Sequence, residues 1–478
     1  MAPQLRPLIT FVLLIASAAL QGQLTHQNIV HNAAGTTASI VNGVASDADG
    51  NLFITGWRTD AIDFGGTAHP QGNGAIFLAK FDPQGNELWN KVSGSADAAG
   101  NHKGMGVAVD GEGNIYNAGW LFVAQAATFD GTTLPAGSFG FVAKYSANGT
   151  LLWVQGQVGG VNAIAIDGNG NPFINLGDAS IEKLDPATGN SIASATGSGD
   201  LMNVLYHNIT IDANNNVIAQ WGNKITKYDS ALNEIWSRPL VKPSLAESFR
   251  ASVDSNGDVW ATFYAIFGTV SLGGVDYTSF PAGYIYKLSG DDGSVLSCAS
   301  PGAYKVKKVF ANGAGELLAS GDFAFNTPGM VKYDAGLTAM WSLTSFDAKD
   351  IVEIGEECFV LGGQHSANVT LDGTTYTRPN GSGQENAIAG YLCAGAVDVD
   401  EVQRTGIVDV YPNPAADRLN ITLRTRTRLD IHDLTGALLR SERLNAGCNA
   451  IDLNELPNGL LLLRDPSGSG AVRVVHED

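Results

Sequence analysis

The chain has 478 residues, of which 28 are basic and 47 are acidic, so its formal net charge at pH 7 is −19. Such an acidic chain repels nucleic acid and anionic membranes, and neither is an expected partner. The four cysteines include no Cys-x-x-Cys pair and are compatible with an oxidising compartment.

Residues 1–22 have the features of a signal peptide. Arg6 supplies a positive charge near the N-terminus, and an apolar run follows at residues 8–20. This run is shorter than the roughly 20 apolar residues that a membrane span requires, and no later stretch approaches that length. We therefore expect an exported protein whose mature form has no membrane span.

Between residues 44 and 392 the chain repeats one loose pattern seven times. An alternating apolar run ends in Asp, a Gly/Asn turn follows, a second apolar run leads to Gly, and a strand with Lys comes next, often ending in Trp. The first halves of the repeats lie at residues 44–56, 107–119, 164–177, 209–219, 251–263, 308–321 and 351–363. Such runs and turns predict short antiparallel strands, and a period of roughly 40 to 60 residues with four strands is typical of propeller blades. We predict an all-β fold that begins with a seven-bladed β-propeller.

The seventh repeat lacks its last strand, because the chain turns polar after residues 386–393. Residues 24–35, ahead of the first repeat, have the pattern of a fourth strand. An unpaired sheet edge promotes aggregation, and closing the ring removes that edge. We therefore expect residues 24–35 to close blade seven, within a propeller that spans residues 23–395.

Three features of the repeat suggest a family. They are the pattern Asp-x-x-Gly-Asn-x-Tyr-x-x-Gly, short turns such as Phe-Gly-Gly at residues 64–66 and Asp-Gly-Thr at residues 130–132, and the ending at residues 141–153. Together they resemble the secreted bacterial β-propeller repeat family over most of residues 40–393. The resemblance implies the propeller fold and no particular activity, since a fold alone does not determine function.

The composition changes abruptly after residues 394–406. No Lys lies beyond Lys349, whereas 9 of the 14 Arg lie from Arg404 onward. Short alternating runs separated by turns fill the rest of the chain. We predict a linker at residues 396–406 and, at residues 407–478, a small Ig-like β-sandwich.

Four ordered blocks occur in this second domain. They are Tyr411-Pro412-Asn413-Pro414, Leu419-Asn420-Ile421, residues 431–436 with Asp433 and Gly436, and Leu456-Pro457-Asn458-Gly459. Together they resemble the type A C-terminal sorting domain of the type IX secretion system of Bacteroidetes. The resemblance implies that residues 407–478 engage the type IX secretion machinery, which passes the protein across the outer membrane for surface attachment or release. The chain departs from that family at its end, where Arg473-Val474-Val475 and His476-Glu477-Asp478 stand in place of a basic ending.

The candidate binding residues are aromatic. Trp57, Trp120 and Phe323 follow the Gly of the second strand in their repeats, and Trp221 lies near the same position of the fourth repeat. These rings could form a stacking surface for sugars. Because they recur at one position of the repeat, packing between blades is the favoured alternative. Long connections between second and third strands in repeats one, two, five and seven are where we expect any binding face.

Asp-rich turns at residues 47–51 and 110–114 resemble calcium loops only in part, because they lack the later bidentate acid of an EF-hand. A hairpin turn whose Asp binds its own backbone is the expected structure. The chain has no His-Glu-x-x-His and no Gly-x-Ser-x-Gly motif, and we expect no cofactor and no metal. Cys358 and Cys393 would lie on neighbouring strands of blade seven, where a disulfide and two free thiols are both open.

These patterns predict an exported protein, at the cell surface or outside the cell, that acts as a binding or interaction module. Its partner would be a glycan or a surface protein. The alternatives are an extracellular enzyme acting on polysaccharide, for which two or three carboxylates around the propeller axis would be the sign, and a structural adhesion component. The patterns favour a protein without catalytic activity.

Overall fold

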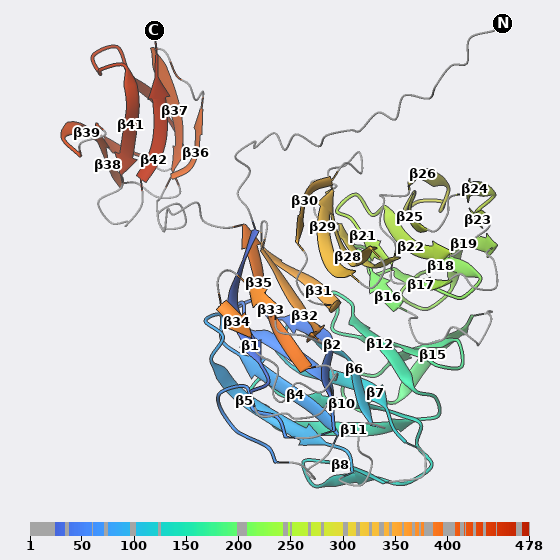
Figure 1. The fold of residues 1–478 in the computed structure, drawn as a ribbon. Coiled ribbons are helices and arrows are strands. Elements are labelled where there is room, and N and C mark those ends of the chain that lie inside the picture. Colours follow the sequence, from blue (N-terminus) through green and yellow to red (C-terminus); the bar gives the residue numbers. More distant parts are fainter. Residues whose placement is uncertain are drawn as a thin grey trace, which may run out of the picture. The chain divides into compact units, whose positions relative to one another are not determined.

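The structure is a computed structural model (Figure 1). It describes residues 24–477 without residues 34–37, 60, 71–74, 96–101, 123–125, 198–207, 242–246, 249–250, 266–268, 279–281, 300–304, 312–315, 325–326, 334–338, 344–346, 356–357, 366–368, 372–373, 377–385, 395–406, 412–414, 416, 424–426, 434–435, 446 and 465–470. The regular elements of the described residues are β-strands, which confirms the all-β prediction, and no described helix is long and apolar enough to cross a membrane. The chain divides into two compact units, one of Leu24–Cys393 and one that contains Ala394–Asp478.

Seven antiparallel sheets make up most of the described part of the first unit. Sheet 1 contains β2 (Ser39–Ser46), β3 (Leu52–Arg58), β4 (Ile76–Phe81) and β5 (Glu87–Ser93). Sheet 2 contains β6 (Lys103–Val109), β7 (Ile115–Trp120), β10 (Gly140–Tyr145) and β11 (Leu151–Gln157). Sheet 3 contains β12 (Val161–Ile166), β13 (Pro172–Leu176), β14 (Ser180–Leu184) and β15 (Ser191–Thr196). Sheet 4 contains β16 (Asn208–Ile211), β17 (Val217–Gln220), β18 (Lys224–Tyr228) and β19 (Glu234–Val241).

The remaining sheets of this unit have the same antiparallel order. Sheet 5 contains β20 (Glu247–Ser248), β21 (Ser252–Val253), β22 (Val259–Ala265), β25 (Ala282–Leu288) and β26 (Val295–Ala299). Sheet 6 contains β27 (Lys305–Ala311), β28 (Leu317–Ala324), β29 (Thr327–Tyr333) and β30 (Ala339–Leu343). Sheet 7 contains β31 (Asp347–Gly355), β32 (Cys358–His365), β35 (Asn386–Ala394) and β1 (Leu24–His31).

One strand of each sheet takes part in a closed cycle of contacts. β2 contacts β6, and the contacts continue through β12, β16, β21, β27 and β31, which contacts β2 again. We call these the inner strands. Each sheet therefore lies between two others, and its apolar residues pack against theirs: Phe53 of sheet 1 clusters with Phe141 of sheet 2, and Val30 of sheet 7 clusters with Val41 of sheet 1.

Sheet 7 is completed by the N-terminal strand, since β1 is hydrogen-bonded to β35 (Figure 1). The Asn32 side chain after β1 is fully buried; it donates to Ser39 Oγ at 3.2 Å and accepts the Asp63 N–H at 3.0 Å. Ser39 Oγ in turn accepts the Ala387 N–H at 3.0 Å. A buried polar network thus joins the first strand of the unit to sheets 7 and 1.

Sheet 7 also contains a disulfide. Cys358 is disulfide-bonded, and the register of β32 and β35 places Cys393 directly opposite it. Opposite residues of an antiparallel pair have the Cβ separation that a disulfide needs. Cys298 is a free thiol, whose pKa is raised to about 11 by burial.

The outer strands of sheets 1 to 6 share a β-bulge. Their register shifts at Lys80/Phe81, Lys144/Tyr145, Lys183/Leu184, Lys227/Tyr228, Lys287/Leu288 and Lys332/Tyr333. In sheets 1, 2, 4 and 6 the extra residue places the Lys of the third strand opposite the Trp of the fourth, as Lys144 lies opposite Trp153. Both side chains therefore point to one face of the sheet.

Two of the long connections expected to form a binding face instead cover an outer strand. The hairpin of β23 (Thr269–Leu272) and β24 (Val275–Thr278) extends sheet 4, because Leu240 on β19 pairs with Leu272. In the hairpin of β8 (Ala127–Phe129) and β9 (Thr132–Leu134), Thr128 exchanges two backbone hydrogen bonds with Gly94, just after β5. A third hairpin, β33 (Val369–Leu371) and β34 (Thr374–Tyr376), follows β32. The sequence indicated how long each connection is, but not which part of the sheet the connection packs against.

The second unit contains two antiparallel sheets. One consists of β36 (Ile407–Tyr411), β37 (Arg418–Leu423) and β40 (Gly447–Asp452). The other has the order β39 (Leu438–Leu444), β38 (Thr427–His432), β41 (Gly459–Arg464) and β42 (Ala471–His476). Both sheets contribute to one apolar core, which includes Leu419, Ile431 and Leu463. In β38 and β41 more and less buried residues alternate, as expected for strands with one face toward a core.

Candidate functional site

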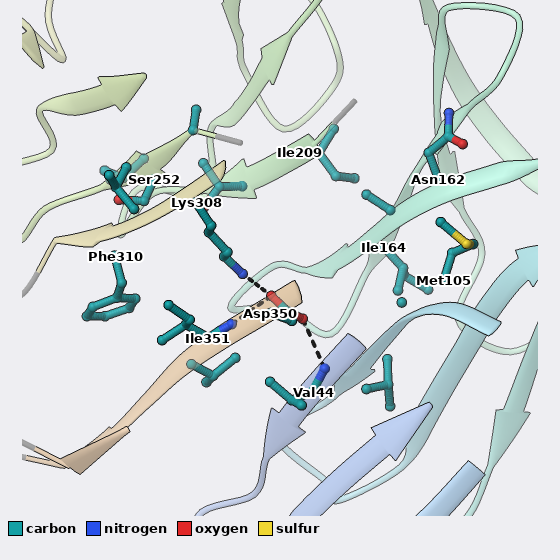
Figure 2. A pocket seen from close by; sticks show the side chains of 18 residues that line it. Val44, Met105, Asn162, Ile164, Ile209, Ser252, Lys308, Phe310, Asp350 and Ile351 are labelled. Atoms are coloured by element: carbon teal, nitrogen blue, oxygen red, sulfur yellow. Dashed lines mark hydrogen bonds and ion pairs between the residues drawn. The ribbon is translucent and has the colours of Figure 1, made fainter. Parts of the chain in front are cut away.

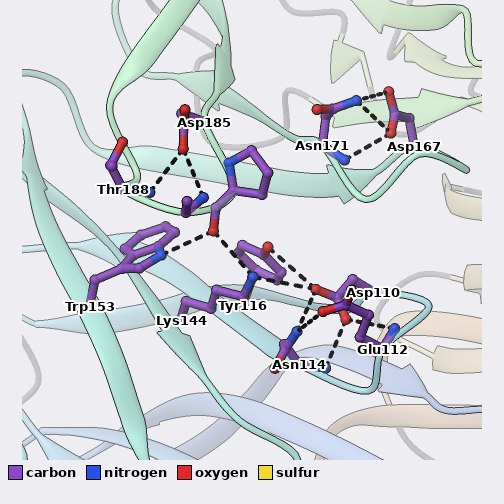
Figure 3. Close-up of polar contacts among 12 residues, drawn as sticks. Asp110, Glu112, Asn114, Tyr116, Lys144, Trp153, Asp167, Asn171, Asp185 and Thr188 are labelled. Atoms are coloured by element: carbon purple, nitrogen blue, oxygen red, sulfur yellow. Dashed lines mark hydrogen bonds and ion pairs between the residues drawn. The ribbon is translucent and has the colours of Figure 1, made fainter.

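The Asp of the repeat closes the turn between the first two strands. In sheet 2, Asp110 Oδ1 accepts the N–H groups of Glu112 at 3.0 Å and Asn114 at 2.8 Å, and Oδ2 accepts Asn114 Nδ2 at 3.0 Å (Figure 3). Gly113 has φ of 80°, a left-handed conformation that Gly adopts without strain. This confirms the predicted hairpin turn. Lys144 Nζ lies 3.5 Å from Asp110 Oδ2. Both oxygens of this carboxylate are therefore bound, by N–H groups and by the Lys144 ammonium.

The Lys and Trp of the repeat bind the next sheet. Lys144 Nζ and Trp153 Nε1 both donate to the carbonyl of Pro186 in sheet 3, each at 3.2 Å (Figure 3). Lys227 Nζ and Trp236 Nε1 likewise donate to one carbonyl in sheet 5, that of Gly290, at 2.8 and 3.1 Å. This role was not predicted from the sequence. The signal was present, because a Lys recurs in a strand that is otherwise apolar.

We expect Lys227→Met to lower the free energy of unfolding by about 3 kcal/mol, because it leaves the Asp212 carboxylate buried without its cation. Lys227 Nζ lies 2.8 Å from Asp212 Oδ2. Burial acts to raise the pKa of Asp212, but hydrogen bonds from Lys227 and Asn216 outweigh it and the pKa is lowered. Urea unfolding measures the effect.

The matched control is Lys224→Met in the same strand. Lys224 Nζ lies 4.0 Å from the exposed Glu234 carboxylate, a pair worth about 0–1 kcal/mol. Equal losses in the two variants would contradict the role given to Lys227.

The structure describes the side chains of three of the four predicted aromatic residues, and each of the three contacts a neighbouring sheet. Trp221 is 0 % exposed and lies in the core between sheets 3 and 4, as the alternative of packing between blades expects. Trp120 Nε1 donates to Asn162 Oδ1 in sheet 3 at 2.9 Å, and Lys103 Nζ of sheet 2 lies 5.2 Å from the centroid of Trp57. These contacts support packing between sheets. Phe323 belongs to β28, but its side chain lies outside the described residues.

The inner strands of all seven sheets line one cavity of about 240 Å³ (Figure 2). Lys308 and Asp350 form an ion pair there, and Asp350 Oδ2 accepts the N–H of Val44 at 2.9 Å. This carboxylate therefore joins sheets 6, 7 and 1. Among the described lining residues Asp350 is the one acid, and it is neutralised by Lys308. The described lining thus offers one carboxylate, whereas most glycosidases use a pair. No group of three or more His, Cys, Asp or Glu among the described residues is placed to hold a metal ion.

Two histidines meet where the ring closes. His31 of β1 and His365 of β32 have their Nε2 atoms 3.0 Å apart, and the Tyr376 ring centroid lies 5.8 Å from that of His31. Burial, together with the nearby His365, lowers the pKa of His31 to about 4. The His31 ring is therefore neutral in the folded state near neutral pH.

We expect the stability of the first unit to decrease as the pH falls from 6.5 to 4. The unfolded chain protonates His31 below about pH 6.5 and the folded chain only near pH 4, so the unfolded state binds more protons in this range. The expected loss is about 2 kcal/mol, since the ring is partly exposed. Urea unfolding across this pH range should show a smaller decrease for His31→Asn, and identical pH profiles would contradict the assignment.

The predicted sorting residues that the structure describes form turns and strand ends. Asp433 Oδ1 accepts the Ala437 N–H at 2.9 Å, and Gly436 has φ of 84° within this turn between β38 and β39. Gly459 begins β41 with φ of 127°. Tyr411 ends β36, and Pro412, Asn413 and Pro414 lie outside the described residues.

Comparison with known proteins identifies the C-terminal part. Residues 409–473 match the family described as "Secretion system C-terminal sorting domain". No curated protein matches the chain. A solved structure described as "The crystal structure of BamB from Moraxella catarrhalis" matches with a TM-score of 0.44 and 12 % identity, over 84 % of this chain and 97 % of that one. The matched domain is the signal of type IX secretion, which confirms the predicted export: the protein is delivered to the cell surface or the extracellular space.

Proposed function

We propose that the protein is a seven-bladed β-propeller that acts outside the cell as a binding module, delivered there by its C-terminal domain. The match of residues 409–473 to the sorting domain carries the proposal. The closed cycle of seven sheets and the N-terminal strand in sheet 7 support the propeller. The two packed sheets of the second unit support an Ig-like sandwich.

The proposed domain organisation follows from these elements. Residues 1–22 are a signal peptide, residues 23–395 the propeller, residues 396–406 a linker and residues 407–478 the sorting domain. The repeat and the secretion signal support an origin in Bacteroidetes and membership of the secreted β-propeller repeat family.

A protein partner is supported by the outer edge of sheet 2. Val158 and Leu240 occupy equivalent positions in sheets 2 and 4. Each comes directly after the residue of the fourth strand that pairs with the first residue of the third strand. Leu240 is 5 % exposed under the hairpin of β23 and β24, whereas Val158 is 79 % exposed. In the described residues no strand pairs with the free edge of β11. An open edge with an exposed apolar residue is a site where an extended segment of a surface protein can add.

Catalysis has less support than binding. In the cavity lined by the inner strands, the Asp350 carboxylate is paired with Lys308. The Asp carboxylates of the repeated turns accept hydrogen bonds, as Asp110 does, and the repeated aromatic residues contact neighbouring sheets, as Trp120 does. A glycan is the second candidate ligand, because Trp57 and Trp120 remain partly exposed.

The test is binding of the purified protein to cell-surface proteins and to a glycan array. We expect Val158→Asp to weaken protein binding by about tenfold, while Val275→Asp, at a 40 % exposed residue of β24, leaves it unchanged. Binding that is carried by glycans and is insensitive to Val158 would favour the second candidate. Saturable turnover of a polysaccharide would contradict a role in binding alone.

A further inference from the structure

Three segments that are distant in the sequence meet at one end of the C-terminal unit. Ala415 donates its N–H to the Val475 carbonyl at 2.8 Å and accepts the Glu477 N–H at 2.9 Å. Between these two residues, His476 Nδ1 lies 3.1 Å from the carbonyl of Pro457. The beginning of the matched domain, the turn before β41 and the C-terminal strand are therefore held together.

A polar cavity of about 280 Å³ lies at this junction. It is lined by Asp417, Asn454, Leu456, Asn458, His476 and Glu477. His476 is 6 % exposed. Because a carbonyl accepts from its Nδ1, the hydrogen is on Nδ1, and Nε2 has no hydrogen-bond partner among the described residues. The cavity thus presents a ring nitrogen, carboxylates and amide groups.

Hydrogen bonding within the fold does not account for the polar side chains at the rim of the cavity. The side chains of Asp417, Asn458 and Glu477 are exposed and form no hydrogen bond or ion pair with the described residues. Elsewhere in this unit other exposed acids do have such partners: Asp452 accepts the N–H of Asn454 at 3.0 Å, and the Glu455 carboxylate lies 3.9 Å from Arg440. Polar side chains that the fold leaves unused are available to a partner.

We propose that this cavity is the surface by which the type IX secretion machinery recognises the protein, an inference that rests on the export role of this domain. Carboxylates and amides here present hydrogen-bond acceptors, so the contacting surface of the machinery supplies donors, Arg and Lys among them. Since the cavity needs the C-terminal strand paired with Ala415, the recognised species is the folded domain. An unfolded C-terminal peptide does not present this surface.

The test is surface delivery of the full chain in a host with a type IX system. The triple variant Asp417→Asn, Asn458→Ala and Glu477→Gln removes the rim groups and keeps every backbone pair. We expect its delivery to fall by about tenfold or more, with unchanged thermal unfolding and accumulation of folded protein in the periplasm. The matched control is Arg443→Gln, at an exposed residue of β39 on the opposite edge of the four-stranded sheet, and it should be delivered normally.

The outcomes separate this inference from the export role itself. Normal delivery of the triple variant, with delivery lost on truncation after Val402, would overturn the cavity as the recognised surface and keep the export signal. Normal delivery of the truncated chain as well would overturn both. If the triple variant unfolds at a lower temperature, the three single variants decide: reduced delivery at wild-type stability supports the inference, and normal delivery of all three overturns it.

Discussion

Val30→Asp is expected to lower the free energy of unfolding of the first unit by about 4 kcal/mol, a loss at the upper end of what single substitutions cause. Val30 is 3 % exposed and clusters with Val41 of sheet 1 and Val360 of sheet 7. The substitution removes these apolar contacts and buries a carboxylate among them. Adding Ile29→Asp, at a partly buried neighbour, should increase the loss. The measurement is urea or thermal unfolding of the purified protein.

Asn28→Asp is the control, because it places the same charge two residues earlier at an exposed position. It removes the hydrogen bond from Asn28 Nδ2 to the Pro83 carbonyl, at 2.7 Å, and should cost about 1 kcal/mol. Unchanged unfolding of Val30→Asp would show that β1 is not needed to complete sheet 7. A similar loss in both variants would assign the effect to charge alone.

Truncation after Val402 is expected to abolish surface delivery and leave a folded first unit in the periplasm. The match to the sorting domain begins at residue 409, so the truncated chain lacks all of it. The first unit has its own core of apolar clusters between adjacent sheets, and residues 394–478 belong to the other unit. Cell fractionation with surface proteolysis, together with thermal unfolding of the periplasmic fraction, measures both parts of the expectation.

Two outcomes would contradict it. Normal amounts of truncated protein at the surface would show that export does not depend on the C-terminal domain. Truncated protein that is unfolded or degraded would show that the first unit depends on that domain for its stability. Full-length protein in the same host is the reference for both measurements.

The local parts of the fold could be predicted because they depend on neighbours in the sequence. Asp110 and Asn114 are four positions apart, and their hydrogen bonds close a turn that the Asp-x-x-Gly-Asn pattern indicates. The expected pairing of the N-terminal segment rested on a missing strand in the last repeat, and the structure places β1 beside β35. Both inferences use only the pattern of the chain.

Contacts between sheets could not be read in the same way. Lys144 and Trp153 meet the Pro186 carbonyl only because a β-bulge turns both side chains toward sheet 3. The sequence left open whether Trp221 packs between blades or faces a ligand. Its backbone N–H donates to the Lys224 carbonyl at 2.7 Å in a short connection, and its ring lies against Gly197, just after β15 of sheet 3. The pattern indicated which residues recur. It did not indicate the direction of their side chains.

The pairing of β1 with β35 has a consequence for the order of folding. The strand of this unit that is synthesised first is hydrogen-bonded to the strand synthesised last, and the Asn32 N–H donates to the Ala387 carbonyl at 3.2 Å. Contacts between residues so distant in the chain raise the contact order, and high contact order slows folding. Sheet 7 cannot be completed until the whole unit has been synthesised. We therefore expect the completion of sheet 7 to be a late step in the folding of this unit.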